Sequence, residues 1–230
     1  MQGSRRSGST FAPRNSGALL LQFFCSLKLI NPVPHLVPLL IRGINNLSDA
    51  RYCAGMGADK LTFVLDPSLP GHVDSKTVKE LAGWIAGVEL IGEFSQLSAH
   101  EINAIAAECA LDAVLLHGLR TTEELAEIAP PIYLELATPA DAATLPRLDA
   151  LLGLVFELSA ESIAESGAVL TEIGSQWPMW LGPGLHPERA QKLASHLPIA
   201  GLVFPSGNEV KPGLRDFDQL EAVFEALEID

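Results

Sequence analysis

Ionisable residues stand at or next to the ends of six consecutive short apolar runs of this chain. The runs cover residues 38–42, 60–65, 89–94, 113–117, 132–136 and 152–157, and the ionisable residues are Arg42, Asp66, Glu93, His117, Glu135 and Glu157. Carboxyl and imidazole groups transfer protons in catalysis, so a place where they gather predicts acid–base chemistry on a small molecule. The competing interpretation is that Arg42 simply pairs with Glu135 or Glu157 at a solvated rim.

Two further apolar runs, residues 179–182 and 200–204, lead into segments that contain glycine and serine. The residues of interest there are Gly182, Gly184, Ser206 and Gly207. Glycine lets backbone N–H groups approach an oxyanion closely, so these segments predict a phosphate-binding site.

The eight apolar runs lack polar alternation, which is typical of parallel strands buried on both faces. The stretches between them have helical spacing and start signals, such as Asp74, Ser98 with Glu101, Thr121 with Glu124, and Pro187. Eight strands alternating with helices predict an α/β fold, a single (β/α)8 TIM barrel. The alternative, an open doubly wound sheet, lacks a GxGxxG motif after the first strand. In a barrel, all the strand ends above would meet at one mouth.

Composition narrows the class of partner. The 230 residues are enough for one sizeable domain, and from residue 36 onward 11 Lys and Arg stand against 28 Asp and Glu. A surface this acidic repels nucleic acid and anionic membranes, so we expect neither as a partner.

The three cysteines form no CxxC pair, which indicates a reducing, cytoplasmic compartment and no zinc site. The tryptophans Trp84, Trp177 and Trp180 are expected to be packing residues rather than a ligand platform.

The first 35 residues differ from the rest. They are basic, and residues 17–27 form an apolar stretch that imitates a secretory signal. That stretch has no convincing cleavage site and is too short to span a bilayer. We therefore expect residues 1–35 to be a disordered extension or the product of a mis-assigned start, and residues 36–230 to form the barrel. A signal or anchor is the alternative.

Several motifs occur in a fixed order along the barrel segment. They are IRGINNLSDA from residue 41, GADKLTFV from 57, LIGEF from 90, DAVLLHG from 112, GLHPE from 184 and GLVFPSGNEVKPGLRD from 201. Together they resemble the phosphoribosylanthranilate isomerase family, from residue 39 to the C-terminus.

The resemblance implies an Amadori isomerisation in tryptophan synthesis, carried out without a cofactor or metal by an intramolecular oxidoreductase of the aldose–ketose type. It implies a cysteine base closing the first strand, an aspartate acid closing the sixth, and phosphate bound by backbone amides after strands seven and eight. Transferred to this chain, the phosphate residues are Gly182, Gly184, Ser206 and Gly207, and the acid is replaced by Glu157. Pro183 stands where a glycine is usual and removes one donor.

Arg42 stands where the resemblance places the cysteine, and a guanidinium cannot abstract a proton at physiological pH. Arg42 instead adds a positive charge suited to a ligand carboxylate or second phosphate. We therefore expect a protein, monomeric or homodimeric, that binds a phosphorylated sugar derivative with altered or lost catalysis. If it is active, Glu157 is the main acid–base residue, with His117 or Asp66 as helper. The alternative is a non-catalytic phosphate-ligand-binding barrel with a binding or regulatory role.

Overall fold

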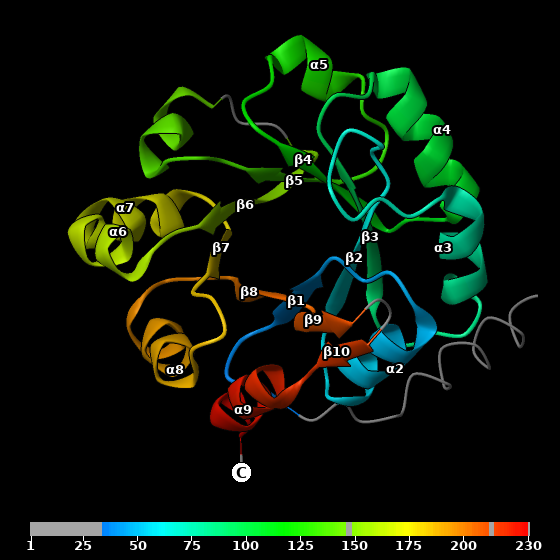
Figure 1. The fold of residues 1–230 in the computed structure, drawn as a ribbon. Helices are drawn as coiled ribbons and strands as arrows, with labels where there is room; N and C mark the ends of the chain where they lie inside the picture. Colours follow the sequence, from blue (N-terminus) through cyan, green and yellow to red (C-terminus); the bar gives the residue numbers. More distant parts are fainter. Residues whose placement is uncertain (1–33, 146–148, 212–213, 230) are drawn as a thin grey trace, which may run out of the picture. The chain divides into compact units, whose positions relative to one another are not determined.

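The computed structural model describes residues 34–145, 149–211 and 214–229. Within them, eight parallel strands close into a barrel in chain order, which confirms the predicted TIM-barrel fold (Figure 1). The strands are β1 (Leu39–Arg42), β2 (Lys60–Val64), β3 (Glu89–Phe94), β4 (Ala113–His117), β5 (Ile132–Glu135), β6 (Leu151–Glu157), β7 (Met179–Gly182) and β8 (Gly201–Pro205). Each begins and ends within about two residues of its predicted range.

Helices surround the barrel (Figure 1). They are α2 (Leu47–Gly55), α3 (Ser75–Ala82), α4 (Ala99–Cys109), α5 (Thr122–Ala126), α6 (Ala160–Glu165), α7 (Gly167–Gln176), α8 (Pro187–His196) and α9 (Asp218–Leu227). The predicted start signals are confirmed at α3, α4 and α5. Asp74 accepts a hydrogen bond from Thr77 N, and Ser98 and Thr121 form capping boxes with Glu101 and Glu124. These caps satisfy backbone N–H groups that a helix start leaves unpaired.

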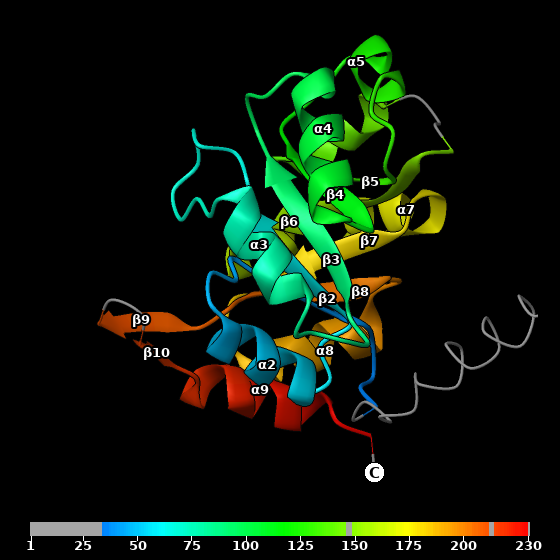
Figure 2. The same cartoon turned by 90° about the vertical axis from the view of Figure 1, so that its right-hand side faces the viewer.

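Three segments differ from a regular alternation of strand and helix. Between β5 and β6 the described residues form only a 3-10 turn, η1 (Pro139–Thr144), after which the backbone is extended at Leu145. The segment after β6 divides into α6 and α7. After β8, the strands β9 (Asn208–Lys211) and β10 (Leu214–Asp216) form an antiparallel hairpin that the sequence did not predict. This hairpin projects from the mouth end of the barrel (Figure 2).

The core has two layers, because strand side chains point alternately into the barrel and toward the helices. The outer layer fills the space between strands and helices and includes Phe63, Phe94, Phe156 and Phe204. The inner layer consists of Leu40, Ile91, Ala113, Leu115, Tyr133, Val155, Trp180 and Val203. Because these side chains fill the interior of the described barrel, a ligand that enters along its axis stops at the mouth.

Trp180 fills the lower part of the barrel interior, and two glycines make room for it. A Cβ atom added at Gly201 would lie 2.3 Å from the Trp180 ring, and one added at Gly153 would lie 3.2 Å from it. Lys60 Nζ lies 5.6 Å from the centre of this ring and pairs with Glu89. The packing predicted for Trp180 is therefore confirmed. The same prediction is wrong for Trp84, which follows α3 and is 70% exposed.

The two ends of the described chain meet. Leu36 N donates to Leu227 O, and Ile229 N donates to Pro34 O. Residues 1–33, and with them most of the predicted extension, lie outside the described residues, so the boundary at residue 36 stays a prediction. Among the described residues, none of the helices has the length and apolar character needed to cross a membrane.

The inference that the missing side chain of Gly201 makes space for the Trp180 ring can be tested. Gly201→Ala forces the new methyl group against the Trp180 ring and the Pro38 carbonyl oxygen. We expect a loss of about 1–3 kcal/mol in the free energy of unfolding, which chemical denaturation measures. The matched control is Gly55→Ala at the end of α2, where nothing lies within 4 Å of the added Cβ. Equal effects of the two substitutions would contradict this account.

Candidate active site

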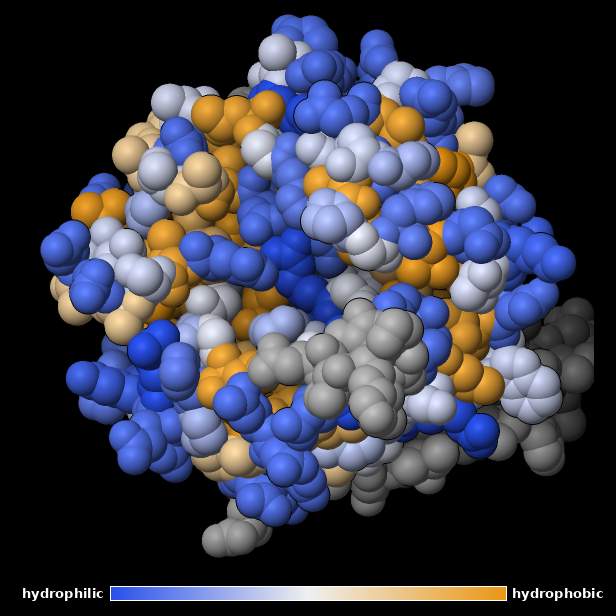
Figure 3. All heavy atoms as spheres, viewed as in Figure 1, coloured by the Kyte–Doolittle hydropathy of each residue, from blue (hydrophilic) through white to orange (hydrophobic). Residues whose placement is uncertain are grey.

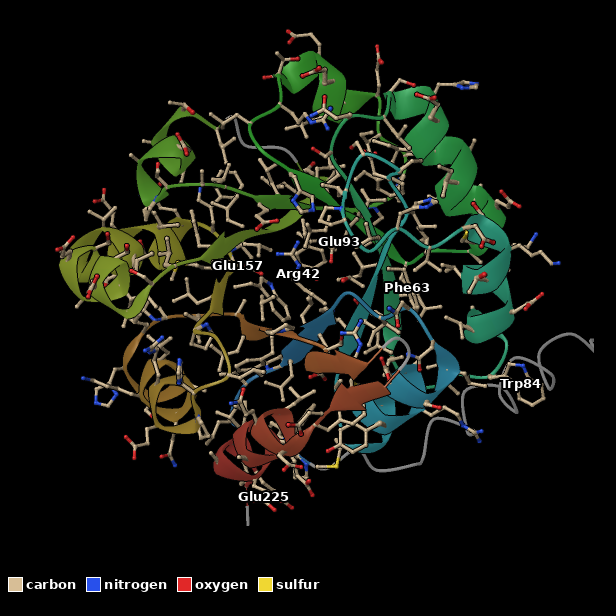
Figure 4. All side chains as sticks on the ribbon, in the orientation of Figure 1. Arg42, Phe63, Trp84, Glu93, Glu157 and Glu225 are labelled. Carbon is tan, nitrogen blue, oxygen red and sulfur yellow. The ribbon has the colours of Figure 1, made fainter. Side chains whose placement is uncertain are left out.

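The mouth of the barrel collects the charged residues that end its strands. Figure 3 shows a hydrophilic hollow at the centre of this face. Arg42 comes from β1, Glu93 from β3, His117 from β4, Glu135 from β5 and Glu157 from β6. Arg42 lies between Glu93 and Glu157 near the middle of the ring (Figure 4). We call these five residues the Arg42 cage.

All five N–H groups of the Arg42 guanidinium have a carboxylate acceptor. Nε and one N–H of Nη2 donate to Glu93, at 3.1 and 2.5 Å. Nη1 and Nη2 each donate to Glu135 at 3.1 Å. The remaining N–H of Nη1 donates to Glu157 Oε1 at 2.6 Å. Burial lowers the pKa of Arg42, but these carboxylates outweigh burial and raise it above its ordinary value.

His117 is held between two of the same carboxylates. Its Nε2 lies 3.1 Å from Glu93 Oε2, and its Nδ1 lies 3.0 Å from Glu135 Oε2. Burial lowers the pKa of this imidazole, but the hydrogen bonds and charges of Glu135 and Glu93 raise it to about 9. His117 is therefore protonated at neutral pH, with both ring nitrogens donating.

Glu93 is the buried anchor of the cage, with 2% of its surface exposed. Beneath it, the Thr62 hydroxyl donates a further hydrogen bond to Oε1. Burial raises the pKa of this carboxyl, but His117, Arg42 and Thr62 together lower it to about 2. Glu135 responds in the same way, because His117 and Arg42 outweigh its burial and lower its pKa.

The Arg42 cage carries a formal charge of about −1 near neutral pH, since three carboxylates face one guanidinium and one imidazolium. Glu157 differs from the other two carboxylates because its side chain is 53% exposed and only Oε1 contacts Arg42. Across the described ranges, no group of three or more His, Cys, Asp or Glu side chains is arranged to hold a metal ion.

Asp66 does not join the cage. Its carboxylate accepts hydrogen bonds from Ser68 N and Oγ and from the backbone N–H groups of Ser95, Gln96 and Leu97. Burial raises the pKa of Asp66, but these bonds lower it well below its ordinary value. Asp66 therefore links the loop after β2 to the loop after β3, and the structure gives no support to its predicted role as a helper in proton transfer.

The loops after β1 and β8 are joined by Arg215 of β10. Its Nε lies 2.8 Å from Asp49 Oδ2, its Nη2 donates to Gly43 O at 3.1 Å, and its Nη1 donates to the Ser206 hydroxyl. Ser206 Oγ in turn donates to Gly43 O at 3.2 Å. The predicted phosphate residue Ser206 is thus part of a network that fixes this edge of the mouth.

The glycines of the predicted phosphate site have the backbone freedom that such a site needs. Gly184 and Gly207 have φ values of +69° and +98°, which side-chain-bearing residues rarely adopt. Arg189 of α8 donates to Pro183 O at 2.8 Å and holds the loop after β7. Gly182 lies beside Glu157 in the register of β6 and β7.

A cavity of about 410 Å³ opens between the cage and the Arg215 network. Its lining includes Arg42, Glu93 and His117 on one side and Ser206 and Arg215 on the other. Its walls include Val64, Leu69 and Pro70. The volume lies within the range of small-molecule sites.

Comparison with known proteins decides the family. No family model matches the chain. The N-(5′-phosphoribosyl)anthranilate isomerase of Acidithiobacillus ferrooxidans is 31% identical over 196 residues, which cover 80% of this chain and 94% of the relative. The chain belongs to the phosphoribosylanthranilate isomerase family.

Solved structures of phosphoribosylanthranilate isomerases share the fold. The enzyme of Thermotoga maritima superposes with a TM-score of 0.71 at 21% identity, over 83% of this chain and 98% of the other. A second structure, with a TM-score of 0.69 at 21% identity over 83% and 97%, is a phosphoribosylanthranilate isomerase in complex with reduced 1-(o-carboxyphenylamino)-1-deoxyribulose 5-phosphate.

Sequence reasoning expected the residues that end the strands to meet at one mouth of the barrel, and it missed two residues that contact them or line the same cavity. Arg42, His117 and Glu157 come together as expected, and the pairing of Arg42 with both Glu135 and Glu157 occurs in the structure. Thr62 was missed, although alternation along β2 gives it an inward position. Arg215 was missed because the hairpin that carries it was not predicted.

The protonation of His117 is directly measurable. We expect an NMR titration of the histidines, assigned with His117→Gln, to give a midpoint near 9 for His117. Because this value exceeds the ordinary 6.5, the ion pairs of His117 stabilise the fold fully below pH 6.5 and lose this effect as the pH rises through 9. Glu135→Gln should lower the midpoint, whereas Glu157→Gln, which removes a carboxylate that does not touch His117, should change it much less. A wild-type midpoint near 6.5 would refute the geometry.

Proposed function

We propose that this chain binds a phosphorylated sugar derivative at the barrel mouth and that the isomerisation of its family is lost or strongly slowed in it. The observation that carries the proposal is the Arg42 cage, in which a cation saturated by carboxylates stands at the end of β1. The resemblance assigns that position to the catalytic base.

An Amadori rearrangement needs a base that removes a proton from carbon and an acid that delivers one to the substrate. Arg42 and His117 are both protonated at neutral pH, so neither accepts a proton there. Glu93 is buried, and its lowered pKa of about 2 makes it a weak base. Both oxygens of Glu135 are bound to Arg42, and one also contacts His117. Glu157 alone has an exposed carboxyl with one oxygen outside the cage contacts.

Support for a phosphorylated ligand comes from the other side of the cavity. Gly184 and Gly207 have positive φ values, so they lack side chains where the loops after β7 and β8 would have to approach an anion. Arg215, which lines the cavity, also forms an ion pair with Asp49. The related isomerase complexed with a deoxyribulose 5-phosphate derivative shows that a barrel of this fold accepts such a ligand.

A second candidate function is the family's isomerisation in tryptophan synthesis, performed with Glu157 as acid and base. The named relative at 31% identity favours it. A barrel that binds a phosphorylated ligand in a regulatory role, without any catalysis, is the third. The isomerase assay below separates the second function from the other two.

We further propose a cytoplasmic location. Cys53 and Cys109 are buried and form no disulfide. Burial raises the pKa of both thiols, to about 12 for Cys53, which keeps them protonated and unreactive. The oligomeric state, monomer or homodimer, stays a prediction.

The first test is an isomerase assay on the full-length chain. We expect no turnover of N-(5′-phosphoribosyl)anthranilate above the uncatalysed rate, and a gain in Arg42→Cys, because a positioned general base contributes about 10²- to 10⁴-fold. Arg42→Ser is the matched control, since it opens the cage equally without supplying a thiolate. Wild-type turnover that disappears in Glu157→Gln would contradict the proposal and establish the second function.

The phosphate site has its own test. Gly184→Asp places a negative charge in the predicted phosphate site, and we expect it to abolish the rise in melting temperature that glucose 6-phosphate gives the wild type. Gly87→Asp is the control, because Gly87 has a similar φ of +85° but lies in the loop before β3, at the opposite end of the barrel. If the two variants respond to the ligand alike, the ligand does not bind at these loops.

A further inference from the structure

The two cations of the Arg42 cage, Arg42 and His117, have no donor left for a ligand. Each N–H of Arg42 already faces a carboxylate oxygen, and both ring nitrogens of His117 do the same. A ligand carboxylate could reach Arg42 only by displacing one of these glutamates. The displaced glutamate would then lie unpaired beside the incoming carboxylate, which is unfavourable in a partly buried site.

The group of the Arg42 cage that is most accessible to a ligand is a hydrogen-bond acceptor, the carboxylate of Glu157. Glu157 makes one contact with Arg42, through Oε1, and its side chain is more than half exposed. The cage as a whole carries an excess of one negative charge, since three carboxylates face two cations. The excess charge and the accessible oxygen both complement a positively charged hydrogen-bond donor.

Glu157 is also close to the predicted phosphate site. It pairs with Gly182 across β6 and β7, and a Cβ added at Gly182 would lie 3.0 Å from Glu157 Cγ. The absence of a side chain at Gly182 thus lets Glu157 lie against the strand that leads into the phosphate-binding loop. The proposed function places the phosphate at the loops after β7 and β8, and Glu157 is the cage carboxylate that pairs with the strand leading into the first of these loops.

We propose that the mouth selects a zwitterionic ligand, a phosphorylated sugar or polyol that carries a protonated amine, and discriminates against one that carries a carboxylate. This inference rests on the proposed function, since it names the class of ligand for the same site. It replaces the expectation that Arg42 receives a ligand carboxylate. The accessible carboxylate oxygen of Glu157 is the group that recognises the ammonium.

The test compares three phosphorylated six-carbon compounds that differ in the second group. Glucosamine 6-phosphate carries an ammonium, glucose 6-phosphate is neutral at that end, and 6-phosphogluconate carries a carboxylate. Titration calorimetry on the full-length chain at about pH 6.5, where the amine is protonated, gives the three dissociation constants. We expect glucosamine 6-phosphate to bind roughly tenfold more tightly than glucose 6-phosphate, as for one charge-assisted hydrogen bond, and 6-phosphogluconate to bind least tightly.

Two variants assign the preference to Glu157. In Glu157→Gln the gap between glucosamine 6-phosphate and glucose 6-phosphate should largely close. In Glu172→Gln, which removes one negative charge from the exposed surface of α7, it should persist. A gap that survives in Glu157→Gln would overturn the assignment.

The outcomes also separate this inference from the function on which it rests. Equal binding of the three compounds, or tightest binding of 6-phosphogluconate, overturns the amine preference and leaves the phosphate-binding barrel standing. Absence of binding by all three overturns the proposed function, and the amine preference falls with it.

Discussion

A guanidinium at the mouth of a closed barrel has to be neutralised by groups that the barrel itself supplies. Arg42 extends from β1 and meets glutamates from β3, β5 and β6, so a single side chain connects distant parts of the strand ring. Removing one partner from such a cluster leaves a partly buried charge without compensation, which costs far more than an exposed ion pair contributes. The cage therefore constrains which residues can change at five strand ends, and it sets the charge that a ligand meets on this side of the mouth.

The same constraint separates the two sides of the mouth. On the cage side, the cations are saturated and the excess charge is negative. On the opposite side, Arg215 links Asp49, Ser206 and Gly43, and the glycines after β7 and β8 leave backbone room for an anion. The two sides of the mouth thus differ in structure. Three carboxylates surround Arg42 on one side, and Arg215 joins Asp49 and Ser206 on the other.

Much of this was accessible from the sequence, for identifiable reasons. Parallel strands buried on both faces appear in the sequence as short apolar runs, which are easy to recognise. Because parallel strands share one direction, the residues that end them must lie at the same end of the barrel. These residues are Arg42, Glu93, His117, Glu135 and Glu157. The sequence does not show which donor pairs with which acceptor at these strand ends. Asp66 follows a strand end like the others, yet one of its carboxylate oxygens accepts from Ser68 and the other from the backbone of the loop after β3. Arg215 lies on a local hairpin that the sequence analysis did not predict, and its contacts with Asp49 and Gly43 join residues far apart in the chain.

The packing of Trp180 has a consequence for how this barrel can change over generations. The indole occupies space that two other strands leave free by having glycine at positions 153 and 201. A larger residue at either glycine clashes with the ring, and a smaller residue at 180 leaves a void beneath the mouth. A single substitution at any of these three positions therefore lowers stability. We expect relatives either to keep all three residues or to replace them together.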